Sequence, residues 1–446
     1  MRDFLPEDVR RREHVIAIIK RVYERYGFEP LETPAVENIE TLLGKYGEEG
    51  NQLIFKILKR GEHEATGQAD LALRYDLTVP LARVVAQHQS KLPRLFKRYQ
   101  IQPVWRADRP ARGRFREFYQ CDVDSLGSTS PVVEAELCAA VSDTLLELGF
   151  TEFIIRLNHR ELLSALLETS GVVESLQASA LVAIDKYEKV GRGGVRDELL
   201  QRGLTSEIGE ALLQALYPVQ SGGDVRTQSR DSEMILSRLS VDLKGHVAGA
   251  AAVENLREIV ALARTTSAAP HIWIDPTLAR GLSYYTDAIM EINVADLAGS
   301  LGGGGRYDNL VGMFLGQNIP ACGFSLGLER ILVVMTERNM FPPTLATTPA
   351  DVMIATFDAA GATPAMRLAA TLRAAGLRVL VYPDPEKIGK QIKYADSRRI
   401  PFVALLGDDE IKAGTVTVKN LGAQTQATYD QSAAGAAILE GLKQRG

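Results

Sequence analysis

Residues 92–126 constrain the fold more than any other part of the chain, because two strand-like runs and a basic turn lie within one hairpin length. The runs, 99–105 and 118–123, are rich in β-branched and aromatic residues, which favour strands. The segment between them contains an aspartate, a proline and a glycine, which are typical of a long hairpin loop. The sequence therefore predicts an antiparallel β-hairpin here.

This predicted hairpin is strongly basic. Residues 91–117 contain nine Lys or Arg against two acids, in a chain of net charge −5. Side chains alternate along an extended strand, so Phe118, Gln120, Asp122 and Asp124 share one face. A phosphate group is the predicted ligand of the basic loop. A solvated, arginine-rich hairpin tip is the alternative.

The order of residues in the predicted hairpin favours phosphate binding over a solvated hairpin tip. The strings WRAD (105–108) and RFREF (114–118) resemble the second signature motif of class II aminoacyl-tRNA synthetases, a hairpin that in the family holds ATP and the acceptor end of tRNA. The continuation FYQCDVD (118–124) resembles the members specific for histidine. The resemblance implies a catalytic, ATP-binding role for Arg106, ATP contacts for Asp108 and Phe118, and contacts with the tRNA acceptor end for Arg109 and Arg116.

The composition is that of an ordinary globular chain, with 46% hydrophobic and 24% charged residues among 446, enough for two or three domains. No apolar run reaches membrane-spanning length, and the N-terminus is too charged for a secretory signal, so a cytoplasmic protein without membrane contact is expected. Cys121, Cys138 and Cys322 are far apart. They are predicted to be core residues rather than disulfide partners or zinc ligands.

The N-terminal segment predicts an amphipathic helix over 7–26, ended by Gly27, and then a short strand over 28–33. A plain helix–strand packing unit accounts for this pattern equally well. The segment also resembles the first class II signature, which builds the dimer interface in that family. The resemblance therefore implies a homodimer.

Residues 70–78, DLALRYDLT, predict a strand with Arg74, Asp76 and Thr78 on one face. A carboxylate and a hydroxyl two residues apart suit an ammonium group. The resemblance implies that Asp76 and Thr78, together with Gln120, bind the α-amino group of histidine. Many bacterial members have Glu where this chain has Asp76 and Asp124, so these sites follow the eukaryotic pattern. The alternative is that these polar groups cap the next helix.

Helical spacing predicts a covering helix over 131–148 and a helix-rich insertion over about 159–266, with loops at GRGG (191–194) and SGGD (221–224). The glycines at 191–194 lack the following Lys-Ser or Lys-Thr of a nucleotide-binding loop. The resemblance implies that this insertion contacts the acceptor arm of tRNA.

Residues 271–292 carry a second histidine-specific string, RGLSYY. The resemblance implies that Arg280 is catalytic and contacts the reacting carboxylate and the α-phosphate. It also implies that Tyr284 and Tyr285 enclose the imidazole, and that Asp124 and Tyr285 read the ring nitrogens. This chain has Ser283 where the family usually has Asp, and Asp287 where Gly is common. Paired tyrosines packed in a core are the alternative.

Residues 301–308 are glycine-rich, which is compatible with a turn or a bulge. Residues 320–335 predict a strand that enters a helix at Gly327, and they resemble the third class II signature. The resemblance implies that Arg330 lies over the adenine of ATP, opposite Phe118. Stacking and cation–π attraction in such an arrangement are worth roughly 1–2 kcal/mol.

Residues 337–349 are rich in proline and threonine and predict a linker. Beyond it, strands at 351–357, 378–382 and 402–406 alternate with helices at 363–375 and 386–398, which predicts a small α/β domain over 350–446. This domain resembles the class II anticodon-binding domain. Five basic residues flank its second helix and suit RNA phosphates, although a solvated face is the alternative: Lys387, Lys390, Lys393, Arg398 and Arg399.

Together these patterns predict an α+β catalytic domain over 1–336, in which helices flank an antiparallel sheet, with a helical insertion and a C-terminal α/β domain. The resemblance implies a ligase that activates L-histidine with ATP and Mg²⁺ and transfers it to tRNA(His). Three alternatives stay open: a catalytically inactive paralogue that regulates histidine biosynthesis, a class II synthetase for proline or threonine, and a non-enzymatic tRNA-binding module.

Overall fold

The computed structural model describes residues 1–61, 66–216, 232–279, 284–342, 345 and 348–444. It divides the chain into two compact units, Met1–Met340 and Phe341–Gly446. Among the helices that the structure describes, none combines the length and the apolar content that a membrane crossing needs.

The predicted hairpin forms the centre of the first unit. Its strands pair antiparallel over ten residues each, and Gln100 faces Asp122 across them. The described residues extend this pair into an eight-stranded sheet. All neighbours in the sheet are antiparallel except β1–β5 and β7–β8. Its strands, in spatial order, are β1 (Glu29–Pro30), β5 (Phe96–Trp105), β6 (Glu117–Leu126), β11 (Ala321–Gly327), β10 (Gly302–Arg306), β9 (Ala288–Asn293), β7 (Ile154–His159) and β8 (Ile272–Ile274).

Three predicted helices pack against this sheet: α1 (Pro6–Arg25), α5 (Val132–Glu147) and α13 (Leu328–Glu337). Val15, Ile18, Ile19 and Val22 of α1 are buried where the helical spacing placed them, while Tyr26, just beyond the end of the helix, is half-buried. Gly27 adopts a φ of +76°, the left-handed conformation that ends a helix, as predicted. The strand predicted next is correct for only two residues, because only Glu29 and Pro30 pair with β5.

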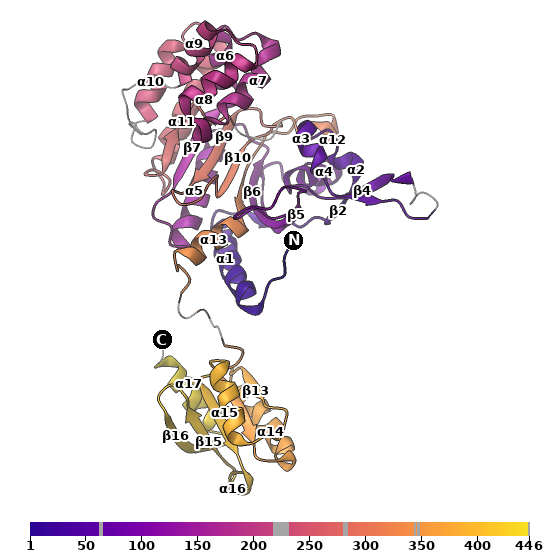
Figure 1. Cartoon of the computed structure of the whole chain (residues 1–446), viewed down its shortest axis with the longest axis vertical. Coiled ribbons are helices and arrows are strands. Elements are labelled where there is room, and N and C mark those ends of the chain that lie inside the picture. Colours follow the sequence, from indigo (N-terminus) through magenta and orange to yellow (C-terminus); the bar gives the residue numbers. More distant parts are fainter. Residues whose placement is uncertain (62–65, 217–231, 280–283, 343–344, 346–347, 445–446) are drawn as a thin grey trace. The chain divides into compact units, whose positions relative to one another are not determined.

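A smaller sheet of three strands lies beside the hairpin, in the order β2 (Val36–Asn38), β4 (Ala69–Leu73) and β3 (Lys56–Leu58). Short helices adjoin it: α2 (Ile39–Leu42), α3 (Gly47–Gln52), α4 (Thr78–His88), the 3-10 turn η2 (Gln89–Lys91) and α12 (Gly312–Leu315). Figure 1 shows β4 in an arm that projects from the side of the unit.

The strand predicted for residues 70–78 is wrong beyond Leu73, where β4 ends. Arg74 turns its buried guanidinium toward the carbonyl oxygens of Thr33 and Pro103, at 2.6 and 2.8 Å. Asp76 accepts the backbone N–H of Val79 at 3.1 Å, in the first turn of α4. A short acidic side chain that accepts a local backbone N–H favours a helix start over a continued strand. Asp76 therefore has the helix-capping role that the sequence left open.

The predicted insertion is a helical bundle, gathered beside β7 in Figure 1. Its helices are α6 (Arg160–Thr169), α7 (Glu174–Ile184), α8 (Tyr187–Gln201), α9 (Ser206–Leu216), α10 (Ser232–Asp242) and α11 (Val247–Ala263). The loop predicted at GRGG is confirmed only as a break at Gly191, whose φ of +67° is non-helical and divides α8 into two helical segments; residues 192–194 are helical again. The loop predicted at 221–224 lies outside the described residues.

The glycine run forms a central strand, β10, which the sequence did not predict. Its neighbours approach too closely for side chains. A Cβ at Gly304 would lie 2.1 Å from the carbonyl oxygen of Gly323, and a Cβ at Gly305 would lie 3.0 Å from the ring of Tyr285. Glycine is needed at these positions because the backbone and the tyrosine occupy the space.

The second unit contains a sheet of five described strands in the order β13 (Val379–Val381), β12 (Val352–Thr356), β14 (Phe402–Leu406), β15 (Thr415–Asn420) and β16 (Thr425–Asp430). Its helices are η4 (Ala359–Gly361), α14 (Ala362–Ala374), α15 (Ile388–Ser397), α16 (Asp408–Ala413) and α17 (Ala434–Lys443). The three predicted strands and two predicted helices are confirmed. The predicted fold, an α+β unit with a mostly antiparallel sheet followed by a small α/β domain, is confirmed as well.

Candidate active site

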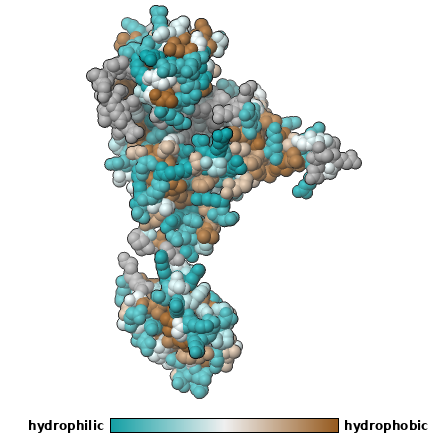
Figure 2. All heavy atoms as spheres, in the orientation of Figure 1, coloured by the Kyte–Doolittle hydropathy of each residue, from teal (hydrophilic) through white to brown (hydrophobic). Residues whose placement is uncertain are grey.

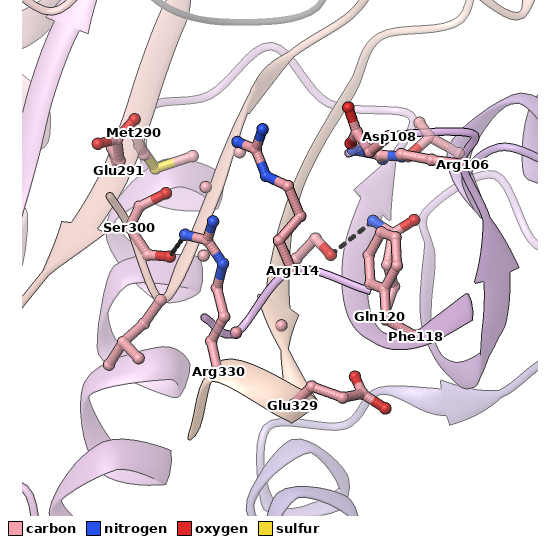
Figure 3. Close-up of a pocket in the computed structure, with 18 of the residues that line it drawn as sticks. Arg106, Asp108, Arg114, Phe118, Gln120, Met290, Glu291, Ser300, Glu329 and Arg330 are labelled. Atoms are coloured by element: carbon pink, nitrogen blue, oxygen red, sulfur yellow. Dashed lines mark hydrogen bonds between the residues drawn. The ribbon is translucent and has the colours of Figure 1, made fainter. Parts of the chain in front are cut away.

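A pocket of about 360 Å³ lies over the face of the large sheet where the hairpin meets β9, β10, β11 and the start of α13. Arg106, Phe118 and Gln120 reach it from the hairpin. Figure 3 shows Phe118 and Gln120 on one side and Arg114 and Arg330 on the other. The pocket thus brings together residues that are more than two hundred positions apart in the sequence.

Arg106 is held firmly at the pocket wall. Its Nε donates to the carbonyl oxygen of Tyr75 at 3.1 Å. Its guanidinium lies 4.3 Å from the ring centroid of Tyr75 and 5.2 Å from that of Phe118. Cation–π contacts on two rings orient the group without neutralising its charge. The arrangement suits the recognition of a phosphate oxygen.

Arg330 lies in the first turn of α13 and lines the same pocket as Phe118. It donates to the carbonyl oxygen of Ser300, and this contact directs its guanidinium along the pocket wall (Figure 3). Asp108 also lines the pocket. Arg109 and Arg116 are exposed, and Arg116 donates through Nε to the carbonyl oxygen of Asp108 at 3.2 Å. Neither Arg109 nor Arg116 is among the described residues that line the pocket.

Four of the residues predicted to bind histidine line the pocket: Thr78, Gln120, Tyr284 and Tyr285. Gln120 donates through Nε2 to the Ser325 hydroxyl at 2.8 Å, as the dashed line in Figure 3 marks. The two tyrosine rings meet edge to face with centroids 5.2 Å apart. Burial raises the pKa of the Tyr284 hydroxyl well above its usual value, so this group is a hydrogen-bond donor at neutral pH.

Asp76 lies behind this wall rather than in it. Its side chain is buried, and its Oδ2 accepts the hydroxyl of Tyr284 at 3.0 Å. Its Oδ1 accepts the hydroxyl of Tyr46 at 2.9 Å. Burial raises the pKa of the Asp76 carboxyl, and hydrogen bonds from Val79, Tyr46 and Tyr284 oppose this rise. These three hydrogen bonds stabilise the ionised form of the Asp76 carboxyl behind the pocket wall.

Asp124 is also set back from the described lining residues. Its Oδ1 accepts the hydroxyl of Tyr307, and its Oδ2 lies 2.9 Å from Nη2 of Arg98. A Cβ at Gly323 would lie 1.9 Å from Oδ1, so the neighbouring strand leaves room for the carboxylate only because it has glycine there. Arg280 and Ser283 lie outside the described residues.

Sequence reasoning did not assign Arg114, Glu291 or Ser325, all of which line the pocket. Arg114 belongs to the basic excess of the hairpin and alternates with Arg116, a signal that could have identified it. Glu291 follows the buried Met290 on β9 without a local pattern that marks it as functional. Only the sheet order brings it to the pocket.

Glu329 also lines the pocket, and the ionisation of its carboxyl group makes the stability of the folded protein depend on pH. Its Oε2 accepts the backbone N–H of Tyr119 at 2.8 Å, while its Oε1 is buried without a hydrogen-bond partner among the described residues. Burial raises the pKa of this carboxyl to about 7. Between its usual pKa and about 7, the folded state holds a proton that the unfolded state releases, so stability falls as pH rises through this window.

We expect Glu329→Gln to become more stable relative to the wild type as pH rises through that window, by roughly 3 kcal/mol in all. Thermal unfolding of both proteins across the window measures the difference. Glu147→Gln is the matched control with the opposite sign, because Arg21 and Arg25 lower the pKa of that exposed carboxyl. The same slope in both variants would contradict the assignment.

Comparisons with known proteins agree with this geometry. The family model for histidyl-tRNA synthetase matches residues 1–331, and the model for the anticodon binding domain matches residues 351–440. A curated histidine–tRNA ligase of Cytophaga hutchinsonii is 40% identical over an alignment of 449 positions, which covers 96% of each chain. The histidine–tRNA ligase of Porphyromonas gingivalis is 40% identical over an alignment of 459 positions, which covers 98% of each chain.

Solved structures give the same result. The crystal structure of histidyl-tRNA synthetase from Nostoc sp. PCC 7120 superposes with a TM-score of 0.79 at 30% identity, over 98% of this chain and 97% of that one. The match extends over both units, and the first of them contains the pocket with the signature hairpin in its wall. This chain therefore belongs to the histidyl-tRNA synthetase family.

Proposed function

We propose that this chain is an ATP-dependent histidine–tRNA ligase, which activates L-histidine to histidyl-adenylate and transfers it to the 3′ end of tRNA(His). One observation carries the proposal. A single pocket joins an arginine–aromatic wall suited to ATP, formed by Arg106 and Phe118, to a polar wall of Gln120, Tyr284 and Tyr285. The end-to-end match with curated histidine–tRNA ligases supports it.

In the first step, an oxygen of the histidine carboxylate attacks the α-phosphorus of ATP. A carboxylate–phosphorus bond forms, the bond to the bridging oxygen breaks, and pyrophosphate leaves. Catalysis of such transfers rests on positioning and charge stabilisation rather than on acid–base chemistry. Arg106 would bind the α-phosphate, and Phe118, Asp108 and Arg330 would hold the nucleotide. Arg280, assigned from its sequence string, would contact both reacting groups.

Histidine would bind at the other end of the pocket. Asp76, Thr78 and Gln120 would receive the α-ammonium group. Asp124 and Tyr285 would read the ring nitrogens, with Tyr284 beside them. A pocket that hydrogen-bonds the ring can reject apolar analogues by roughly 10⁴–10⁵, because these analogues leave buried polar groups unpaired.

Mg²⁺ would accompany ATP and neutralise the charge of its phosphates. Within the described part of the chain, no group of three His, Cys, Asp or Glu side chains is placed to hold a metal. Mg²⁺ in nucleotide sites typically uses one or two carboxylates together with the phosphates. Asp108 and Glu291 line the pocket and fit that donor set.

The tRNA would meet this protein at several places. Arg109 and Arg116 are exposed on the hairpin and would contact its acceptor end. The α6–α11 bundle would contact the acceptor arm. The domain over 350–446 would bind the anticodon, and its α15 carries exposed Lys390 and Lys393. The residues between the catalytic domain, 1–336, and this domain would act as a linker.

We also propose that the protein acts as a homodimer in the cytoplasm, where tRNA is charged. Exposed apolar side chains on and beside the small sheet support a partner surface: Val36, Leu43 and Leu58. Figure 2 shows apolar residues gathered on the arm that carries this sheet. Patches of this kind are typical of interaction sites.

Amino-acid-dependent ATP–pyrophosphate exchange with each of the twenty amino acids tests the function. We expect exchange with histidine alone. Exchange with proline or threonine would show a different synthetase. No exchange with any amino acid would favour the inactive paralogue, an alternative that none of the comparisons supports.

A further inference from the structure

Arg98 is a fully buried cation close to the pocket that no predicted role includes. It lies on β5 directly across from Asp124 on β6, so both side chains share one face of the sheet. Nη2 of Arg98 lies 2.9 Å from Oδ2 of Asp124, and the two side chains are 0% and 3% exposed. The arginine side chain carries a delocalised positive charge. Arg98 therefore gives Asp124 a counter-charge.

The same guanidinium reaches a second part of the site. Nη2 of Arg98 donates to the carbonyl oxygen of Leu77 at 3.5 Å, and Nη1 donates to Oε1 of Gln100 at 3.3 Å. Leu77 lies between Asp76 and Thr78, the pair assigned to the amine of histidine. One side chain thus links the ring-reading end of the pocket to its amine-binding end.

The charges around Arg98 explain why the pocket needs it. Asp76, Asp122 and Asp124 are all buried here. Burial raises the pKa of Asp122 to about 7 and also raises that of Asp124, and Arg98 opposes both rises. Without the guanidinium, close carboxyl groups in a dry site favour protonation. A protonated Asp124 would no longer be a strong acceptor for a ring N–H.

We propose that Arg98 is a positioning residue for histidine recognition, which holds Asp124 against Tyr307 and ties it to the backbone between Asp76 and Thr78. Arg98 sets the distance between Asp124 and the amine-binding residues, and it maintains the charge of Asp124, without contacting the substrate. This inference rests on the proposed function. It adds a specificity determinant that lies below the pocket wall.

The test uses the full chain and histidine-dependent ATP–pyrophosphate exchange. We expect Arg98→Met to raise KM for histidine by on the order of tenfold to a hundredfold, because removal of one partner leaves a buried charge uncompensated. KM for ATP should change by less than about threefold, since the nucleotide wall is separate. Arg98→Lys keeps the charge but not the forked geometry, so it should restore part of the affinity for histidine.

The pH profile separates positioning from general destabilisation. Other titratable groups contribute to the same environment: Tyr23 on α1, Asp76, Tyr285, Tyr307 and Cys322 on β11. In Arg98→Met the carboxyl pair should hold its protons to a higher pH than in the wild type. The ratio of the variant's KM for histidine to that of the wild type should therefore be largest near about pH 6 and fall toward about pH 9.

Arg83→Met is the matched control, because Arg83 forms a salt bridge of 2.7 Å with the buried Glu37 and is not one of the described residues that line the pocket. It should lower stability without changing KM for histidine. If Arg98→Met lowers stability without changing KM for histidine, the inference is overturned. It is also overturned if Arg98→Met does not fold and Arg98→Lys has a wild-type KM for histidine. If the wild type lacks histidine-dependent exchange, the proposed function itself fails.

Discussion

Arg106→Ala should reduce the rate of histidine-dependent ATP–pyrophosphate exchange by on the order of 10²–10³, because one pre-oriented donor to transition-state charge is typically worth that much. The two rings and the Tyr75 carbonyl hold Arg106 in place before ATP binds. Because Arg106 is already oriented, no reorganisation of this group is required when the transition state forms. The loss should therefore appear in kcat, with a smaller change in KM for ATP.

The folded state should tolerate this change, since Arg106 is only half-buried at the pocket wall. Arg112→Ala is the matched control from the same loop. Arg112 pairs with Glu337 on the exposed surface, and its loss should leave exchange within about threefold of the wild type. Near wild-type exchange by Arg106→Ala would refute the proposed role. Equal losses in both variants would point to a displaced hairpin loop instead.

Asp76→Asn should raise KM for histidine strongly, with a loss in kcat/KM on the order of 10², because it removes the charge that would pair with the α-ammonium group. Asparagine keeps one oxygen, which in the place of Oδ1 can accept the Val79 N–H and the Tyr46 hydroxyl. The start of α4 should therefore remain intact. Steady-state exchange at varied histidine and at varied ATP separates the effect on KM for histidine from the effect on KM for ATP. KM for ATP should stay within about threefold of the wild-type value.

Asp143→Asn is the matched control for this second variant. Asp143 also accepts a tyrosine hydroxyl, that of Tyr26 at 2.7 Å, but it lies on α5 and is not among the described residues that line the pocket. Its KM for histidine should equal that of the wild type. If Asp76→Asn binds histidine normally, the buried carboxylate serves only to cap α4 and to hold the two tyrosines.

Local patterns were enough to predict much of this fold. The helical spacing of α1 and the strand-like runs of β5 and β6 were correct, because period and propensity are carried by neighbouring residues. The prediction failed where a local group competed with the pattern. The alternation of residues 70–78 continued past Leu73, but the bonds of Arg74 and Asp76 ended the strand.

The glycine strand β10 shows a second limit. Its residues have no side chains to carry a periodic signal, and its place in the sheet follows from the close approach of β11 and Tyr285. A run of glycines in isolation fits a turn as well as a strand. The sequence identified the string as important without identifying its conformation.

The sequence by itself determined the family, the order of the signature strings, the two-part α+β architecture and the residue types of the pocket wall. Only the tertiary structure decided which residues line the wall of the pocket and which lie behind that wall. Tyr284 and Asp76 meet across 208 positions, and Arg98 faces Asp124 because β5 and β6 pair in one register. The partner of a buried charge is set by strand order and register, and no local pattern in the chain encodes that choice.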